Sequence, residues 1–96
     1  MSNNSQKPIQ FSNHAVDQIA DRGTTKEEVE KAVREGEPVP AKLGRLSFRK
    51  NFPFNSKWKN KDYEIKQVMP VVAEENDKFV VITVYVFYFG GAWNES

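Results

Sequence analysis

The stretch FSNHAVDQIADRGTTKEEVEKAV, residues 11–33, decides the fold, because it carries the start and stop signals of two successive helices. Ser12 is suited to cap the first helix, and Phe11 just before it can pack on Val16 as a hydrophobic staple. Gly23 is the residue type at which helices commonly end. We therefore predict a short helix between Ser12 and Gly23.

The second helix begins with a capping box, in which Thr25 and Glu28 are three residues apart. Gly36 ends it. Its apolar residues recur at helical spacing and form one stripe, made of Val29, Ala32 and Val33. The stripe predicts a helix that covers a sheet.

Beyond the helices the pattern changes to strands. Pro38 and Pro40 force extended backbone, so we expect residues 36–44 to be a linker. Alternating and β-branched runs predict strands at Leu46–Phe52, Tyr63–Ala73 and Lys78–Phe89, joined by a loop at Pro53–Lys61 and a hairpin connection at Glu74–Asp77. Pro70 within the second strand indicates a sheet edge or a bulge.

The predicted fold class is α+β, with two N-terminal helices packed on one face of a small twisted antiparallel sheet. The 96 residues suffice for one domain. We expect a disordered leader over residues 1–8, a single domain over 9–90 and a tail over 91–96, with Trp93 able to pack back on the domain.

Composition excludes several classes of protein. The chain has no cysteine and one histidine, which leaves no disulfide framework and no ordinary zinc cluster. Residues 1–10 lack the apolar core of a signal peptide, and no apolar run approaches the ~20 residues that cross a bilayer. We expect no membrane association and a cytoplasmic site of action.

Positive charge is concentrated between Lys42 and Lys66, although the whole chain carries a net charge of only +1. This stretch has two acidic side chains and eight cationic ones: Lys42, Arg45, Arg49, Lys50, Lys57, Lys59, Lys61 and Lys66. Aromatic residues lie among them at Phe48, Phe52, Phe54, Trp58 and Tyr63. Cations interleaved with rings are typical of a single-stranded nucleic acid site, and a solvated basic loop is the alternative.

Alternation along the last strand predicts two different faces. One carries the aliphatic residues Val80, Ile82, Val84 and Val86, which suit the helix-covered side. The other carries Phe79, Val81, Thr83, Tyr85, Phe87 and Phe89. Thr83 and Tyr85 suit the floor of an open cleft, because buried hydroxyls need hydrogen-bond partners. Alternatively, Thr83 serves strand propensity and Tyr85 a half-exposed position. Lys66 and Gln67 point to opposite faces, and register decides which of them joins Thr83 and Tyr85.

His14 is the one side chain that titrates near neutral pH without perturbation, and it lies at the start of the first helix. The helix dipole there disfavours imidazolium and keeps the ring able to accept a proton. Gln18 and Arg22 follow at four-residue spacing along the same stripe. The alternative is an ordinary surface histidine and arginine on an amphipathic helix.

A neutral base, fixed cations and hydroxyl donors would suffice for RNA cleavage without a metal or cofactor. The base takes the proton from the ribose 2′-OH, which attacks phosphorus, while cations stabilise the phosphoryl oxygens and an acid protonates the leaving 5′ oxygen. Tyr85 and Lys66 are both candidates for the acid. We expect Arg45, Arg49 and Lys66 to contact phosphate near the reaction, and Lys57, Lys59 and Lys61 to attract the RNA, with Lys50 in the same basic surface.

Two stretches carry a resemblance to known proteins. Residues 11–33 match the pattern H-A-x-x-[RQ]-x-x-x-R-G followed by a Thr-capped helix, and KQVMPVVAEENDKFVVITVYVFYF, residues 66–89, looks like a terminal hairpin with a T-x-Y strand. Together they resemble a small toxin-type domain family similar to the superfamily of barnase, EndoU, colicin and RelE-like ribonucleases.

The resemblance implies an endoribonuclease acting on transfer RNA or another cellular RNA, neutralised by a cognate immunity protein or antitoxin. By match to the motifs, His14, Arg22, Thr83 and Tyr85 would be the catalytic residues. Such a domain is either free-standing or delivered from outside as part of a secreted toxin, and both alternatives stay open. A non-catalytic RNA-binding module and a protein-interaction domain on the same fold are the other candidate functions.

Overall fold

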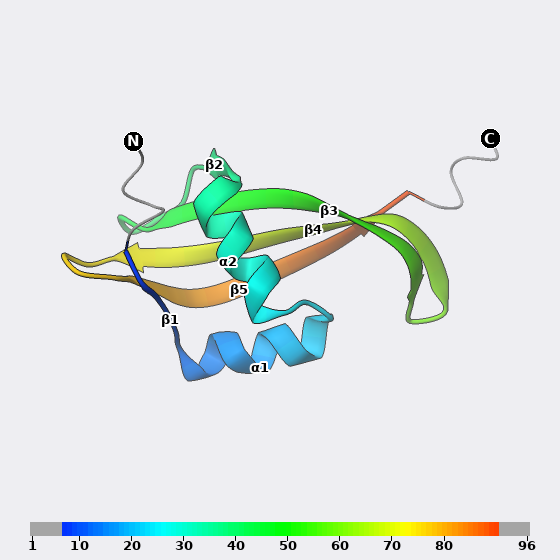
Figure 1. Ribbon diagram of the computed structural model, residues 1–96, viewed down its shortest axis with the longest axis horizontal. Helices are drawn as coiled ribbons and strands as arrows, with labels where there is room; N and C mark the ends of the chain where they lie inside the picture. The colour runs from blue at the N-terminus through cyan, green and yellow to red at the C-terminus, as the bar shows by residue number, and fades with distance from the viewer. Residues whose placement is uncertain (1–6, 91–96) are drawn as a thin grey trace.

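Two helices and five strands make up the computed structural model, which describes residues 7–90 (Figure 1). In chain order they are β1 (Ile9–Phe11), α1 (Asn13–Arg22), α2 (Lys26–Glu35), β2 (Glu37–Val39), β3 (Leu46–Trp58), β4 (Lys61–Glu74) and β5 (Phe79–Phe89). The predicted tail with Trp93, and the predicted leader up to residue 6, lie outside the described residues. The last leader residues are described and are held in place: Lys7 Nζ lies 2.8 Å from Glu74 Oε2, and the Pro8 carbonyl accepts from Phe79 N.

The predicted helix ends are confirmed. The Ser12 side chain accepts a hydrogen bond from Ala15 N at 3.1 Å, and Thr25 Oγ1 accepts one from Glu28 N at the same distance. Gly23 ends α1 in the left-handed conformation, with φ at 80°. Local caps therefore fix both helices, as the sequence predicted.

The sheet has the strand order β1-β5-β4-β3-β2. β2 to β5 pair antiparallel, which confirms the antiparallel sheet predicted for the three long strands, whereas β1 runs parallel to β5 and makes the sheet mixed. β1 was not predicted, and the prediction that Glu37–Val39 belongs to a linker was wrong. Both strands have three residues, which is too short for a period of two to be recognised.

The predicted loop at Pro53–Lys61 was also wrong. β3 continues to Trp58, and the hairpin closes at Lys59 and Asn60, whose φ angles are 52° and 72°. Two successive positive φ angles characterise a type I′ hairpin turn, whose twist matches that of the strands. The local irregularity is a register shift between Pro53 and Ser56. The residues predicted as a loop therefore form a long hairpin that contains a bulge.

Pro53 and Pro70, the prolines of the long strands, lie in different settings. β2 pairs with β3 only as far as Arg49, so Pro53 lies where β3 is an outer strand and a missing N–H is tolerated. Pro70 is in β4, at the centre of the sheet, so the predicted edge position was wrong. Ser47 Oγ on β3 donates to the Pro70 carbonyl at 3.0 Å. The alternative prediction of a bulge agrees with the register shift next to it, between Val71 and Val72.

That shift exchanges the two faces of β5. Thr83 pairs with Val71 and Val81 with Val72, so Ile82 is an extra residue on β5. Before this bulge, Phe79 and Val81 face the helices and are fully buried, contrary to the prediction. After it, the alternation is the predicted one: Val84 is buried in the core with Val86 packed against it, while Tyr85, Phe87 and Phe89 are exposed. The bulge is the physical reason, because one inserted residue reverses the alternation.

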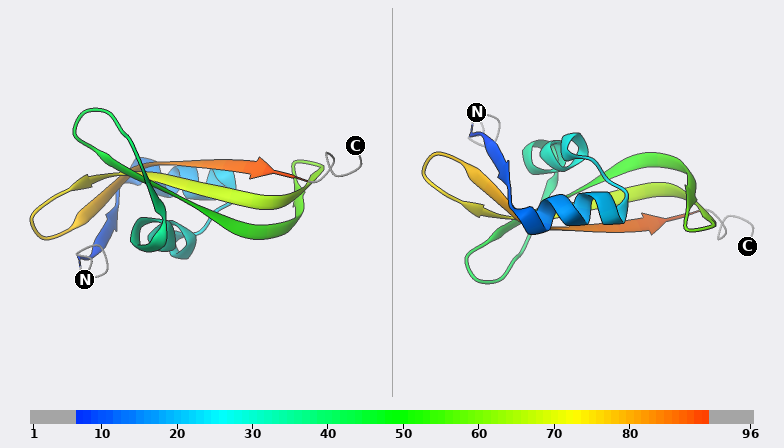
Figure 2. Two further views of the ribbon diagram at one scale, coloured as in Figure 1. Left: turned by 90° about the horizontal axis from the view of Figure 1, so that it is seen from above. Right: turned by 90° about the horizontal axis from the view of Figure 1, so that it is seen from below.

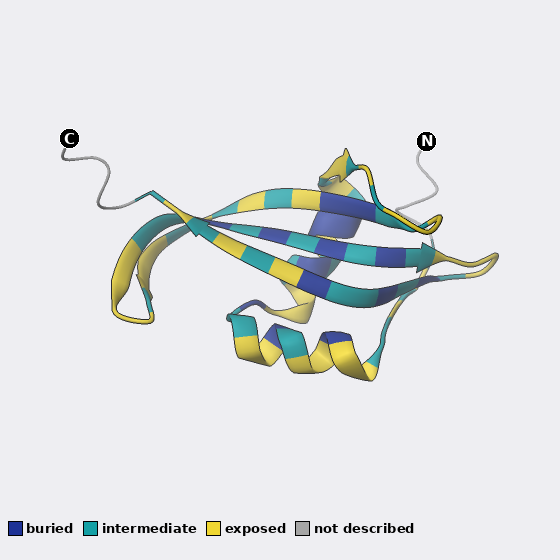
Figure 3. Ribbon diagram, turned by 180° about the vertical axis from the view of Figure 1, so that it is seen from behind, coloured by how far each residue is buried: buried dark blue, intermediate teal, exposed yellow. Residues whose placement is uncertain are grey.

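The helices occupy different positions beside the sheet (Figures 2 and 3). α2 packs on one face, over β3 and β4, and α1 lies along β5. The core between them is apolar and mostly aliphatic, and it contains Ala15, Ile19, Val29, Ala32, Val33, Phe48, Val68, Val72, Phe79, Val81 and Val84. The β2–β3 loop, residues 40–45, stands on the opposite side of the sheet from α2 (Figure 2). Among residues 7–90 no helix is long and apolar enough to cross a membrane.

Candidate functional site

Helix α1 completes the edge of β5. β1 pairs with β5 only as far as Val81, and beyond it the side chains of α1 bind the backbone of β5. The Gln18 carboxamide oxygen accepts hydrogen bonds from Thr83 Oγ1 and from Val84 N, the latter at 2.7 Å. Arg22 Nη1 donates to the Val84 carbonyl at 2.9 Å. Two residues of the predicted stripe therefore hold the strand next to its bulge.

Tyr85 joins this edge to the open face of the sheet. The Arg22 guanidinium lies over the Tyr85 ring, 5.6 Å from its centroid, and Phe87 stacks beside the ring at 6.5 Å. The Tyr85 side chain is 41% exposed. The cation and the aromatic ring thus form one accessible surface.

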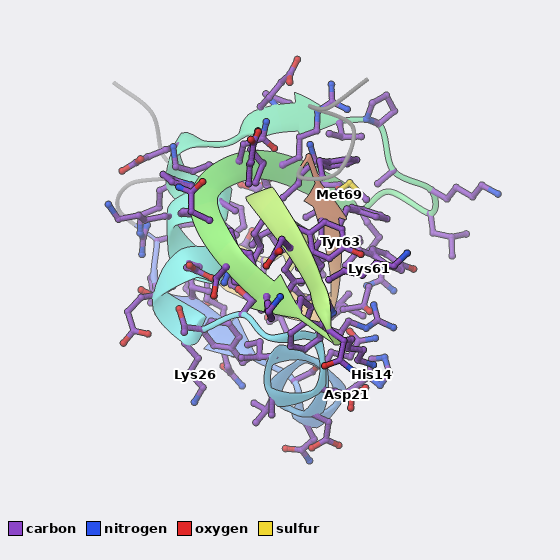
Figure 4. All side chains as sticks on the ribbon, turned by 90° about the vertical axis from the view of Figure 1, so that its right-hand side faces the viewer. His14, Asp21, Lys26, Lys61, Tyr63 and Met69 are labelled. Carbon is purple, nitrogen blue, oxygen red and sulfur yellow. The ribbon has the colours of Figure 1, made fainter. Side chains whose placement is uncertain are left out.

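His14 lies at the other end of the same stripe. Its side chain is exposed and, within the described residues, makes no hydrogen bond or ion pair. It lines a shallow hollow on α1 together with Gln18 and Arg22. Figure 4 shows His14 on the side of the molecule where Met69 lies, with Lys26 on the opposite side. The four residues predicted as catalytic therefore lie along one edge: His14 and Arg22 on α1, and Thr83 and Tyr85 on β5.

A groove opens next to this edge, between the β2–β3 loop and the open face of the sheet. Its volume is about 410 Å³. Thr83 and Tyr85 line it from β5, and Lys42 and Arg45 line it from the loop. Neither of these two cationic side chains makes an ion pair within residues 7–90. Most of the other residues that line the groove are apolar, so the groove combines an apolar interior with two available positive charges on one wall.

Lys66 lies on the opposite face of the sheet. It is 6% exposed, and its Nζ lies 2.8 Å from Glu28 Oε1 and 2.9 Å from the Gly23 carbonyl oxygen. The Phe54 ring lies against the same ammonium, 5.4 Å away. Gln67 takes the open face instead and donates to Asn51 Oδ1. Register thus gives the buried position to Lys66, where its ammonium neutralises a helix carboxylate and does not reach the groove.

The other predicted RNA contacts are distributed over the surface. Three are paired with carboxylates: Arg49 with Glu37 at 3.1 Å, Lys50 with Glu35 at 3.5 Å and Lys57 with Asp62 at 3.1 Å. Exposed pairs of this kind are weak, so they do not prevent contact with phosphate. Lys59 lines a second hollow together with Arg22 and Tyr85, while Lys61 is exposed at the end of the same hairpin. Arg45 and Lys59 are therefore the predicted cations nearest to the α1–β5 edge.

The aromatic residues of the basic stretch have structural roles. Phe48 is in the core, and Phe54, Trp58 and Tyr63 surround Tyr88, which stacks on Trp58 at 5.1 Å. Tyr88 donates to the Arg22 carbonyl at 2.8 Å. Burial, with a smaller contribution from the charge of Glu28, raises the pKa of the Tyr88 phenol. The rings on the open face come from β5 instead.

Sequence reasoning missed two parts of this arrangement. Gln18 was placed on the stripe without a role, because its partners are more than sixty residues away. The sequence predicted an open cleft with Thr83 and Tyr85 on its floor, but not the apolar wall that Val39, Pro40 and Leu43 give it, because residues 36–44 had been assigned to a linker. Within residues 7–90, no three His, Cys, Asp or Glu side chains are grouped as metal ligands would be.

Fold and site together define a small α+β domain in which a polar helix stripe and a bulged strand border an open groove. The chain belongs to the family described as Domain of unknown function (DUF4258), whose model matches residues 11–86. Comparison with curated proteins and with solved structures gave no match. The matched residues include all of α1 and both Thr83 and Tyr85, so the candidate edge lies inside the family domain.

Proposed function

We propose that this domain is a metal-independent endoribonuclease toxin, related to the barnase, EndoU, colicin and RelE-like ribonucleases. One observation carries the proposal: His14, Arg22, Thr83 and Tyr85 lie along one edge, beside a groove with two cations on its wall. The four residues come from segments about sixty residues apart in the chain. Their assembly around an open surface supports a site.

In the proposed reaction His14 removes the proton from a ribose 2′-OH. His14 lies in the first turn of α1, where its exposed ring is accessible to a bound strand. The 2′ oxygen then forms a bond to phosphorus while the bond from phosphorus to the 5′ oxygen breaks. The products are a 2′,3′-cyclic phosphate and a strand with a 5′-OH, and DNA is not cleaved because it lacks the nucleophile.

Arg22 and Lys59 stabilise the charge on the phosphoryl oxygens, because both line the hollow next to Tyr85. Tyr85 is our candidate for the acid that protonates the 5′ oxygen, since its hydroxyl makes no hydrogen bond within the described residues. Lys66 was the other candidate, and its buried ion pair argues against it. Thr83 acts as a positioning residue, because its hydroxyl donates to Gln18.

The proposed substrate is transfer RNA or another cellular RNA, attracted by the basic surface around the groove. The proposed partner is a cognate immunity protein or antitoxin that covers the same surface. The exposed aromatic residues of β5, Phe87 and Phe89, support such a contact because rings are enriched in protein interfaces.

Incubation of the purified protein with total RNA in EDTA, followed by mapping of cyclic phosphate ends, tests the proposal. His14→Ala should abolish cleavage without altering the circular dichroism spectrum. Lys31→Ala, an exposed change on α2, is the control and should leave cleavage unchanged. Full cleavage by the His14 variant would overturn the assignment.

The same assay separates the alternatives. Salt-dependent binding of RNA that is never cut would identify a non-catalytic RNA-binding module. Absence of RNA binding at moderate salt would leave the protein-interaction function.

A further inference from the structure

The groove is more apolar than cleavage of a phosphodiester requires. Apart from its polar rim, it is lined by Val39, Pro40, Leu43, Met69, Val71 and Ile82. Its volume of about 410 Å³ lies within the range of about 300–1,000 Å³ typical of small-ligand sites. A phosphate alone gains nothing from such walls, so they fit an apolar part of the ligand.

The rim of the groove carries the complementary chemistry for a charged part of the same ligand. Lys42 and Arg45 line one wall, and neither makes an ion pair within the described part of the chain. Tyr85 lines the other side and also borders the hollow that contains Arg22. An occupant that is flat and apolar on its faces and anionic at its edge satisfies both features.

The tip of the β2–β3 loop adds an independent observation. Arg45 N donates to the Lys42 carbonyl at 3.1 Å, and the two residues between them, Leu43 and Gly44, have φ angles of 61° and 69°. This is the geometry of a type I′ turn, in which Asn or Gly is strongly preferred at the first central position. Leu43 takes that position, and it is 89% exposed to solvent. An apolar side chain kept in an unfavourable conformation and in water, at the mouth of a groove, indicates contact with a ligand.

We propose that the groove binds one unstacked nucleobase of single-stranded RNA, adjacent to the phosphate that is cleaved. Leu43 contacts the base at the mouth of the groove, and Lys42 and Arg45 bind its phosphate. Bases splayed out of single strands are recognised in this way, by apolar and aromatic surfaces combined with backbone cations. The identity of the substrate as RNA rests on the proposed function.

The test compares two uncleavable strands that carry the same charge. One is a mixed-sequence 2′-O-methyl RNA hexamer, and the other is a hexamer of the same sugar–phosphate length that lacks all bases. Leu43→Asn removes the apolar side chain while keeping a residue that tolerates positive φ. We expect it to weaken binding of the base-containing strand about tenfold or more, the effect of no longer burying one leucine side chain against the base, and to change binding of the abasic strand less than twofold.

Lys42→Ala is the matched control in the same turn. It should weaken binding of both strands equally and lower the salt dependence by about one phosphate contact. Equal losses for both strands with Leu43→Asn, or no loss for either, would overturn the groove assignment. So would a wild-type protein that binds neither strand.

Failure of the groove assignment is distinguishable from failure of the proposed ribonuclease function. Base-dependent binding by a protein that never cuts total RNA would refute the ribonuclease and leave the groove assignment standing. Cleavage that depends on His14, without any effect of Leu43 on base-dependent binding, would refute only the groove assignment.

Discussion

Lys66→Met is the most informative perturbation, because it decides between a structural and an RNA-binding role for a lysine in the basic stretch. The Lys66 ammonium is buried between the carboxylate of Glu28 and the carbonyl of Gly23. Methionine fills a similar volume but leaves both oxygens without this partner. Thr24 Oγ1 continues to donate to Glu28, so the carboxylate keeps one hydrogen bond.

The magnitude follows from the burial of the pair. Removing one partner of a fully buried ion pair costs about 3–5 kcal/mol. The Glu28 side chain is 26% exposed, and water can solvate part of the orphaned carboxylate. We therefore expect Lys66→Met to lower the free energy of unfolding by about 2–3 kcal/mol. For a domain of this size that loss corresponds to a fall in Tm of roughly 10–20 °C.

Urea titration followed by circular dichroism measures the effect. Lys61→Met changes an exposed lysine on the same strand and should stay within about 0.5 kcal/mol of the wild type. In the double variant with Glu28→Gln, part of the loss should be recovered, because the orphaned charge is gone. A Lys66→Met protein with wild-type stability but weakened RNA binding would refute the ion-pair reasoning and restore Lys66 as a phosphate contact.

Three further predictions concern the surroundings of the site. Gly44→Ala should destabilise the domain by about 1–2 kcal/mol, the cost of placing a side chain in the left-handed conformation. Gly23→Ala should destabilise it by more. Both glycines have positive φ, but a Cβ at Gly23 would lie 2.6 Å from the Trp58 ring, whereas nothing lies within 4 Å at Gly44; equal losses in urea titrations would contradict this. Gln18→Ala should cost about 1–3 kcal/mol and accelerate hydrogen exchange at the Val84 amide, and unchanged exchange there would exclude Gln18 as the support of β5. Because the pKa of Tyr88 is raised in the folded protein, its stability contribution is complete below the unfolded pKa of about 10 and is lost as the pH rises through the folded value. The wild type should therefore lose more stability above pH ~10 than Tyr88→Phe does, and parallel pH profiles would contradict the shift.

The helices were predictable because their signals are local. Ser12 and Thr25 bind amides three residues away, so the caps are contained in a window of a few residues. The antiparallel order of the three long strands was predictable for a similar reason, since short connections join neighbours in sequence. His14, Gln18 and Arg22 were placed on one stripe by helical spacing alone.

The faces of β5 were only half predictable. Alternation after the bulge places Tyr85 on the open side, as the sequence indicated, but before it Phe79 and Val81 turn into the core. A bulge depends on how two strands align, and the sequence of one strand contains no sign of the extra residue at Ile82.

The sequence by itself determined the two capped helices, the strand-rich second half and the residue types available for chemistry, because each depends on neighbours along the chain. The tertiary structure alone decided that Lys66 is buried against Glu28 while Gln67 faces the groove side, and that Lys42 and Arg45 stand across from Tyr85. The physical reason is register: a slip of one residue exchanges the faces of a strand, and register is set by partners distant in the chain.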